Sequence, residues 1–319
     1  MSMKIKRLVI ENFKSIERIE LIEPNPFTVF VGPNGSGKSN IFEALEFVNL
    51  SDKYIDPKSL FGGLENLQRR QNKSSDFKFH IDLDKVQINL TGFSDTNPVD
   101  HSASLKDLTT VSDIKNQYLN RFSRLFVGNN RLLKIAINDN QRLSISAGNL
   151  EKVLKRVLSD DILKNEIFEW LELFIPEFKA VEIDERDELH WFEEFAPNYF
   201  VKELISDGTY NILAMLTAVY QSDDKPQFLC IEEPENGLHP QVAGELVDFF
   251  RIMCEERGHH IWLNTHSQSM IARLRPEEMV IVDKKKGATR TKQISKEDFK
   301  NWRMDEALLT NAFGGGLPW

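Results

Sequence analysis

Long apolar segments are missing from this sequence. The longest nearly apolar stretch, residues 212–220, is far shorter than the roughly 20 residues that a membrane-spanning helix needs. The charged start, MSMKIKR, leads into a strand-like pattern rather than into the apolar core of a signal peptide. We therefore expect a soluble, cytoplasmic protein without a membrane partner.

Cysteine is also scarce. Cys230 and Cys254 are the two cysteines of the chain, they lie far apart, and Cys230 stands in an apolar run. Buried free thiols explain this usage better than a disulfide or a metal site.

Positive charge is in deficit, since the formal net charge is −9. The phosphates of nucleic acid are usually met by a basic surface, so any contact with DNA must be local. One basic cluster is available, and a solvated hairpin tip is its simpler interpretation. It consists of Lys284, Lys285, Lys286, Arg290 and Lys292.

What remains is an ordinary globular composition, with 319 residues, of which 41% are hydrophobic and 28% charged. Alternating apolar residues predict antiparallel strands near residues 5–10 and 16–21, then a buried strand at 27–31. A helix at 40–50 and further strands at 76–93 follow. Amphipathic helices dominate residues 95–200, for example at 150–158 and 162–175, with a hairpin around 138–141.

Strand-like runs return at residues 227–231, 260–264 and 279–283, separated by helical segments, which is typical of a parallel α/β sheet. We therefore predict a two-lobe α/β protein. Its discontinuous core lobe comprises residues 1–95 and 225–319, with a parallel core sheet and an antiparallel N-terminal sheet. Residues 96–224 form an inserted, mainly helical lobe. The absence of sustained heptads excludes a long coiled-coil arm.

Residues 32–39 fit the pattern G-x-x-x-x-G-K-[ST] between a strand and a helix, which is the context of a true P-loop. Its backbone N–H groups and the following helix start would bind the phosphates of ATP, and Lys38 would reach the β- and γ-phosphates. Ser39 would place its hydroxyl on Mg²⁺. The predicted nucleotide-binding residues are Gly32, Pro33, Asn34, Gly35, Ser36, Gly37, Lys38, Ser39 and Asn40.

A P-loop needs an acidic residue at the end of a neighbouring strand, and the apolar run 228–231 ends in Glu232 and Glu233. We predict that Glu232 holds the water shell of the Mg²⁺ ion. Glu233 is placed to accept a proton from the attacking water, which predicts hydrolysis of ATP and not only binding. Aspartate is more common than glutamate at the position of Glu232.

The run IEEPENGLHP at residues 231–240, together with IENFKS at 10–15, resembles the ABC-type AAA ATPases of bacterial genome maintenance and anti-phage defence. That family includes RecF-like heads, structural-maintenance-of-chromosomes heads and the ATPase half of overcoming-lysogenization-defect nucleases. The resemblance covers most of residues 1–95 and 200–285. It implies the fold of an ABC-ATPase head.

The resemblance also implies roles for residues outside the P-loop. Ser206 and Gly208 match the signature motif, which faces the γ-phosphate held by a second subunit. His266 matches the switch histidine that senses the γ-phosphate, and residues 236–239 match the D-loop. Lys14 matches a basic residue that approaches the phosphates. Gln68 and Gln71 are alternative positions for the Q-loop glutamine.

By this resemblance, two chains would enclose two ATP molecules head to tail. The chain has no toprim-like acidic cluster after His266 and no recognisable nuclease, so we expect it to gate a separately encoded effector, most simply a nuclease acting on DNA. Its apolar tail, residues 308–319, would dock that partner or pack on its own core.

The nucleotide-binding subunit of a membrane transporter is the alternative function, although the segment IENFKS fits that class poorly. A GTPase lacks support because the sequence has no N-K-x-D motif to recognise guanine: Asn72-Lys73 is followed by Ser74 and Ser75. A non-hydrolysing regulator is disfavoured by Glu233.

Overall fold

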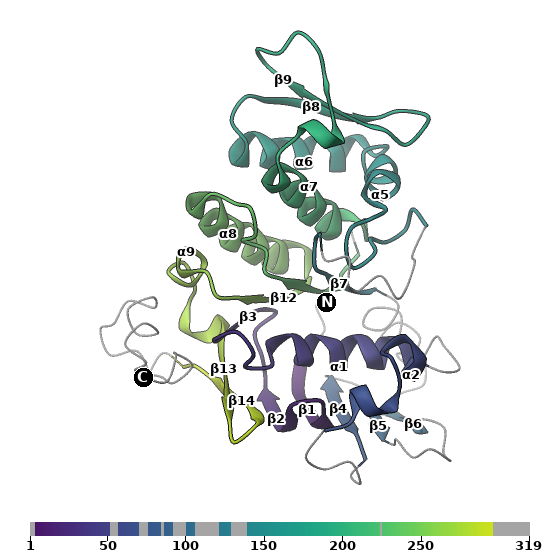
Figure 1. Ribbon diagram of the computed structural model, residues 1–319, viewed down its shortest axis with the longest axis vertical. Coiled ribbons are helices and arrows are strands. Elements are labelled where there is room, and N and C mark those ends of the chain that lie inside the picture. The colour runs from purple at the N-terminus through teal and green to yellow at the C-terminus, as the bar shows by residue number, and fades with distance from the viewer. Residues whose placement is uncertain are drawn as a thin grey trace.

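A large mixed sheet forms the centre of the protein (Figure 1). The computed structural model describes residues 4–51, 57–69, 76–83, 86–91, 100–105, 121–128, 139–223 and 225–295. Within them, eleven strands follow one another in the order β6-β5-β4-β1-β2-β14-β13-β3-β12-β11-β7. The strands are β1 (Ile5–Phe13), β2 (Ile16–Ile22), β3 (Phe27–Val31), β4 (Lys78–Leu83), β5 (Val86–Thr91), β6 (Asp100–Leu105), β7 (Phe122–Leu125), β11 (Phe228–Glu232), β12 (His260–Thr265), β13 (Met279–Lys285) and β14 (Ala288–Gln293).

The parallel part of the sheet is buried on both faces. Strands β7, β11, β12, β3 and β13 run parallel, and every residue of β3, β11 and β12 is buried. On β3, Phe27, Val29 and Val31 join one apolar cluster, whereas Phe30 joins the other. Helix α1 (Lys38–Ser51) covers one face and α8 (Pro240–Arg257) covers the other (Figure 1). Such two-sided burial explains the continuous apolar runs of these strands.

The antiparallel part extends the same sheet. β1 pairs with β2 and with β4, and β4, β5 and β6 continue the antiparallel order. The predicted N-terminal strands are thus confirmed, but they do not form a separate sheet. Strand β14 pairs in parallel with β2 and so joins the two parts.

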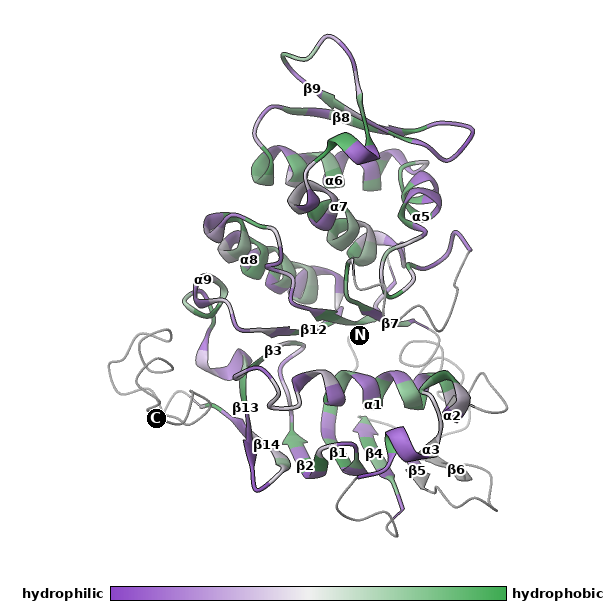
Figure 2. Cartoon of the chain, viewed as in Figure 1, coloured by the Kyte–Doolittle hydropathy of each residue, from purple (hydrophilic) through white to green (hydrophobic). Residues whose placement is uncertain are grey.

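In its described residues, the second lobe contains three helices and a small sheet. The helices are α5 (Leu150–Val157), α6 (Asp161–Phe174) and α7 (Asp207–Tyr220), and the sheet contains β8 (Phe178–Ile183), β9 (Leu189–Glu193) and β10 (Phe200–Val201). On α6, the Asp160 side chain caps the first turn, and Leu163, Ile167 and Leu171 form its buried stripe. The hydropathy colouring alternates along α6 and is more uniformly apolar on α7 (Figure 2).

The lobe boundary differs in two places from the division expected at residues 96 and 224. Strands β6 and β7 belong to the eleven-stranded sheet although both fall inside that range. The small sheet β8–β10 was not expected in a mainly helical lobe. The expected hairpin at residues 138–141 lies partly outside the described residues, and residues 139–142 form bends.

The remaining elements of the described residues are short. They are α2 (Pro57–Leu60), α3 (Leu64–Leu67), α9 (Gln268–Ile271) and the 3-10 helices η2 (Lys202–Leu204) and η3 (Pro276–Glu278). Cys230 and Cys254 are free and buried, as predicted. None of the helices in the described part of the chain has both the length and the apolar character needed to cross a membrane. The C-terminal segment 308–319 lies outside the described residues.

Two buried histidines before and within β12 predict a loss of stability in acid. Burial lowers the pKa of His259 and of His260 from 6.5 to about 4, and Arg257 adds to the effect at His259. Between pH 6.5 and 4 the unfolded chain therefore binds more protons than the folded one. The stabilisation is fully present above about pH 6.5 and is lost as the pH falls through this window, by about 3 kcal/mol per histidine.

Urea unfolding at a series of pH values measures this loss. We expect His260→Phe, which keeps a ring beside Phe228, to show a shallower fall in the free energy of unfolding than the wild type. An unchanged slope between pH 6.5 and 4.5 would show that His260 is not buried in its neutral form.

Candidate functional site

The P-loop connects the end of β3 to the start of α1, at the edge where the parallel strands have their carboxyl ends. A Cβ added to Gly32 would lie 2.0 Å from the carbonyl oxygen of Val282, and one added to Gly37 would lie 2.1 Å from Oγ1 of Thr289. Gly37 also has a φ of +103°. Glycine at these two positions is therefore required by close packing against the β13–β14 hairpin.

The polar atoms of the P-loop form a cradle for an anion. Lys38 Nζ donates hydrogen bonds to the carbonyl oxygens of Gly32 (2.6 Å) and Pro33 (3.2 Å). Burial lowers the pKa of Lys38, an effect opposed by nearby carboxylates. Ser36 Oγ is buried and has no hydrogen-bond partner among the described residues. A Cβ on Gly35 would face open space. A buried ammonium beside an unpaired hydroxyl and an open backbone turn fits a phosphate chain.

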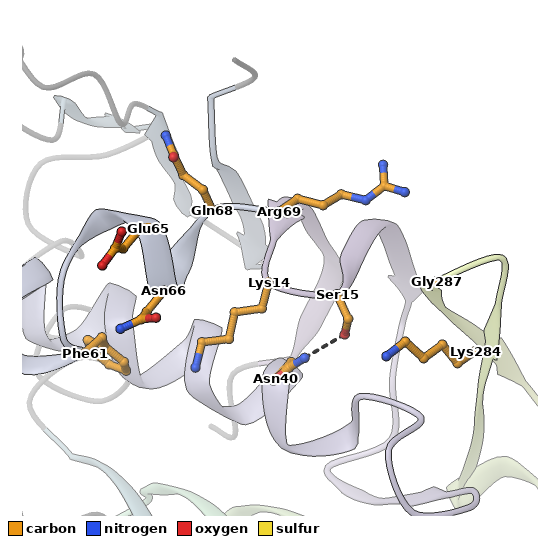
Figure 3. A pocket seen from close by; sticks show the side chains of 10 residues that line it. All are labelled: Lys14, Ser15, Asn40, Phe61, Glu65, Asn66, Gln68, Arg69, Lys284 and Gly287. Carbon is orange, nitrogen blue, oxygen red and sulfur yellow. Dashed lines mark hydrogen bonds between the residues drawn. The ribbon is translucent and has the colours of Figure 1, made fainter. Parts of the chain in front are cut away.

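The P-loop is braced from behind by hydroxyl groups. Thr289 Oγ1 donates to the carbonyl oxygen of Ser36 (2.8 Å) and lies 2.6 Å from Oγ of Ser15. Asn40 Nδ2 donates to Ser15 Oγ at 2.6 Å (Figure 3). Thr289 is fully buried. It connects the P-loop to a strand about 250 residues further along the chain.

Beside Asn40 lies a pocket of about 550 Å³ (Figure 3). Its lining residues are Lys14, Ser15, Asn40, Phe61, Glu65, Asn66, Gln68, Arg69, Lys284 and Gly287. The Lys14 ammonium pairs with Glu43 on α1. Gln68 lines the same pocket as Lys14. The alternative position for the Q-loop glutamine, Gln71, lies outside the described residues.

The acidic partner of the P-loop is in contact with it. Glu232, at the end of β11, is 3% exposed and accepts a hydrogen bond from Ser39 Oγ on its Oε2 atom at 2.5 Å. Asn264 Nδ2 donates to the same oxygen at 3.0 Å. Arg124 Nε donates to the other oxygen, Oε1, at 2.6 Å. The predicted neighbours Ser39 and Glu232 thus meet, and both amino-acid types are suited to Mg²⁺.

Glu233 follows directly and is half-buried, with a φ of +47°. Its N–H group donates to the backbone oxygen of Asn264 (3.0 Å) and to Oδ1 of Asn264 (3.2 Å). Its carboxylate accepts from Asn236 Nδ2 at 3.1 Å. Glu233 also lines a second pocket, of about 950 Å³. Asn264 thus fixes the carboxylate of Glu232 and the backbone of Glu233 together.

His266 follows the end of β12, the strand next to β11. Its side chain is 49% exposed, and Nδ1 lies 3.8 Å from Oε1 of Glu235. The same Glu235 oxygen accepts from the N–H of His266 (3.1 Å) and from Oγ1 of Thr265 (2.6 Å). Glu235 therefore fixes the backbone that carries the histidine and leaves the ring accessible.

The predicted signature residues stand at the start of α7. Ser206 is exposed and is the N-cap, with its side chain accepting from Thr209 N–H at 3.1 Å. Gly208 has a role within its own chain, because an added Cβ would lie 2.4 Å from the carbonyl oxygen of Gly237. Asn211 Nδ2 also donates to the Asn236 carbonyl at 2.8 Å. The start of α7 is thus locked against the loop 236–239.

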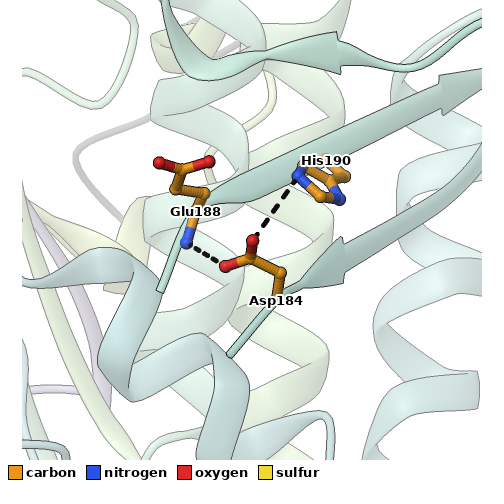
Figure 4. A group of neighbouring side chains, drawn as sticks. All are labelled: Asp184, Glu188 and His190. Carbon is orange, nitrogen blue, oxygen red and sulfur yellow. Dashed lines mark hydrogen bonds and ion pairs between the residues drawn. The ribbon is translucent and has the colours of Figure 1, made fainter. Parts of the chain in front are cut away.

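A separate group of Asp184, Glu188 and His190 has ligand atoms close enough for a metal ion (Figure 4). A simpler explanation is available from the turn between β8 and β9. The Asp184 carboxylate accepts from the N–H groups of Glu188 and Arg186, both at 2.8 Å, and these bonds lower the pKa of Asp184. The cluster is therefore the closure of a hairpin.

Comparison with known proteins adds the family. A protein-family model described as "AAA domain, putative AbiEii toxin, Type IV TA system" matches residues 27–272. The chain belongs to this AAA family. The match extends from β3 through both lobes to α9, so it includes the P-loop, Glu232, Glu233 and His266. The resemblance to ABC-type AAA ATPases that the sequence predicted is confirmed.

Two relatives of this AAA chain differ in how much they cover. The chromosome partition protein Smc of Methanocaldococcus jannaschii is 50% identical over 98 residues, which cover 26% of the chain and 8% of that protein. The OLD nuclease of Thermus scotoductus is 24% identical over 307 residues, which cover 79% of the chain and 56% of that protein. The chain thus spans about half, or less, of the length of these relatives.

Solved structures show the fold. The Smc head bound to the C-winged helix domain of ScpA has a TM-score of 0.67 at 18% identity and covers 92% of this AAA chain and 98% of its own. The Smc head domain with an extended coiled coil from Pyrococcus furiosus has a TM-score of 0.64 at 16% identity, covering 92% and 97%. The predicted ABC-ATPase head fold is confirmed, and family membership supports ATPase activity.

Proposed function

We propose that the chain binds ATP with Mg²⁺ and hydrolyses it to ADP and phosphate. The observation that carries this proposal is the contact between Ser39 of the P-loop and Glu232, with Glu233 as the next residue. A P-loop that only bound nucleotide would not need a second carboxylate at this edge.

Each group has a role in this proposal. When ATP binds, Lys38 would leave the carbonyl oxygens of Gly32 and Pro33 and contact the β- and γ-phosphates. The buried, unpaired hydroxyl of Ser36 would be available to the same phosphates. Ser39 and Glu232 would hold Mg²⁺, which neutralises phosphate charge when bound. Glu233 accepts the proton of the attacking water, and His266 orients the γ-phosphate from the next strand.

The pocket beside Asn40 suits the ribose and base. It adjoins the end of the P-loop, and its lining offers carboxylate, amide and ammonium groups for hydrogen bonds. Lys14 contributes its ammonium there. Because Lys14 pairs with Glu43 in this structure, it would have to leave that carboxylate in order to contact a phosphate.

The second part of the proposal is a dimer that closes head to tail around ATP. Ser206 is exposed at a helix N-terminus, where its N–H groups suit a phosphate, and it has no hydrogen bond to its own P-loop among those found in the described residues. Together with Gly208, it would complete the site of a second chain. The open pocket at Glu233 is the surface that this second chain would cover.

The ATP cycle would gate a separately encoded effector, most simply a nuclease acting on DNA, in DNA maintenance or anti-phage defence. Support comes from the relative in Thermus scotoductus, which is named a nuclease and which this chain matches over 56% of its length. We place this activity in the cytoplasm.

Phosphate release from the purified wild-type chain tests the ATPase. We expect Mg²⁺-dependent turnover of ATP that EDTA abolishes, and no turnover in Lys38→Ala. A wild-type chain that binds ATP without releasing phosphate would refute hydrolysis. Affinity capture in the presence of ATP should recover a nuclease or DNA, whereas co-fractionation with membranes would favour a transporter subunit.

A further inference from the structure

One buried arginine contacts the site, and its role is unassigned. Arg124 lies on β7, the edge strand that runs parallel to β11, where it is opposite Cys230. Its side chain is only 3% exposed. Arginine is rarely buried unless it is paired, so its partners indicate its purpose.

The partners of Arg124 are carboxylates from two elements. Nε donates to Oε1 of Glu232 at 2.6 Å, and a second guanidinium nitrogen also contacts that oxygen. A terminal nitrogen donates to Glu46 on α1 at 2.6 Å, and Glu43 lies 3.7 Å away. Burial would lower the pKa of Arg124, but these three carboxylates raise it above its ordinary value. The guanidinium is therefore permanently charged.

The contact divides the two oxygens of Glu232 between different tasks. Oε1 is occupied by Arg124, whereas Oε2 faces Ser39 and Asn264. A glutamate side chain has one more rotatable bond than an aspartate, so its carboxylate needs an additional anchor to remain in one orientation. The rigid fork of a guanidinium supplies such an anchor, and a lysine ammonium does not.

We infer that Arg124 is a positioning residue of the ATPase site, which holds the Glu232 carboxylate towards Ser39 so that Mg²⁺ can bind there. The inference rests on the proposed function, because it concerns the same metal site. It predicts that Arg124 acts on the use of Mg²⁺ through Glu232 and not on the binding of the nucleotide itself.

The competing explanation is purely structural, since Arg124 also connects β7 to α1 through Glu46. A matched control is available in the same chain. Arg251 has a side chain that is 9% exposed and donates to both oxygens of Glu278, at 2.6 and 2.9 Å, on α8 and η3. Arg251→Lys removes a similar buried fork outside the nucleotide site.

The test compares Arg124→Lys with Arg251→Lys and the wild type. A fluorescent ADP analogue is titrated first without and then with increasing Mg²⁺, and phosphate release and urea unfolding are measured in parallel. For Arg124→Lys we expect nucleotide affinity without Mg²⁺ within about threefold of the wild type. The Mg²⁺ concentration for half-maximal effect should rise at least about tenfold, with a similar fall in kcat, as is typical when the support of a metal ligand is lost.

Arg251→Lys should lose stability but keep the wild-type Mg²⁺ requirement. If both variants show the same Mg²⁺ requirement, Arg124 is structural and the inference is wrong. If the wild type hydrolyses no ATP, the proposed function fails instead. Should Arg124→Lys not fold, the charge-balanced double variant Arg124→Met with Glu46→Gln provides the same comparison, with the raised Mg²⁺ requirement again expected.

Discussion

Glu233→Gln should reduce phosphate release by at least about a hundredfold, because the amide cannot accept the proton of the attacking water. ATP binding should persist, because in the described residues the side chain of Glu233 forms no hydrogen bond with Lys38 or Ser39. The isosteric amide can still accept a hydrogen bond from Asn236. Light scattering with Mg-ATP should therefore detect a dimer that the variant retains and that the wild type loses as it hydrolyses ATP.

Glu255→Gln provides the control for this variant, because Glu255 is 61% exposed and pairs on the surface with Arg275. It should keep wild-type turnover. If the mass measured by light scattering were the same with and without nucleotide in all three proteins, the ATP-driven dimer would be contradicted and a permanent assembly indicated. If Glu233→Gln hydrolysed ATP at the wild-type rate, Glu233 would not be the group that accepts the proton of the attacking water.

Ser206→Arg should abolish the dimer and reduce hydrolysis at least about a hundredfold without weakening the binding of ATP to the single chain. Ser206 is exposed, so a larger side chain can be accommodated within its own subunit. At a head-to-tail interface, however, the arginine would occupy the position of the partner's γ-phosphate. Phosphate release as a function of protein concentration measures the effect.

Ser159→Arg is the matched control, since it adds the same side chain at an exposed position between α5 and α6 of the same lobe. It should behave as the wild type. Equal turnover in Ser206→Arg and the wild type would show that each chain hydrolyses ATP without its partner's helix α7.

The parts of the site that the sequence predicted are local. The P-loop is a continuous segment whose glycines, lysine and serine are recognisable by spacing, and Glu232 and Glu233 directly follow an apolar strand. His266 was expected from its resemblance to the switch histidine, directly after a predicted strand. For these residues the neighbouring sequence already determines which edge of the sheet they occupy.

The supporting residues could not be predicted, because their roles depend on which strands are neighbours. Arg124 meets Glu232 across 108 positions, and Thr289 meets Ser36 across 253. Asn264 is the last residue of the predicted strand 260–264, but only the pairing of β12 with β11 places its amide on Glu232. The signal that the sequence offered for Arg124 was a basic residue within the short, largely apolar run 122–127.

The fold followed the same rule. Long periodic segments such as α5 and α6 were recognised, whereas the short β8–β10 sheet was not predicted because it lies in a region interpreted as helical. Strands β6 and β7 were not predicted, because residues 95–200 were interpreted as mainly helical, and the expected lobe boundary therefore left both strands out of the large sheet.

The brace between Thr289 and the P-loop has a consequence for the order of synthesis. Strand β3 and the P-loop emerge from the ribosome early, yet β3 lies between β12 and β13, and the P-loop contacts β14. The first of these neighbours, β12, begins at residue 260, and the last, β14, ends at residue 293. A nascent chain therefore carries the complete P-loop sequence long before β14 is present to contact it.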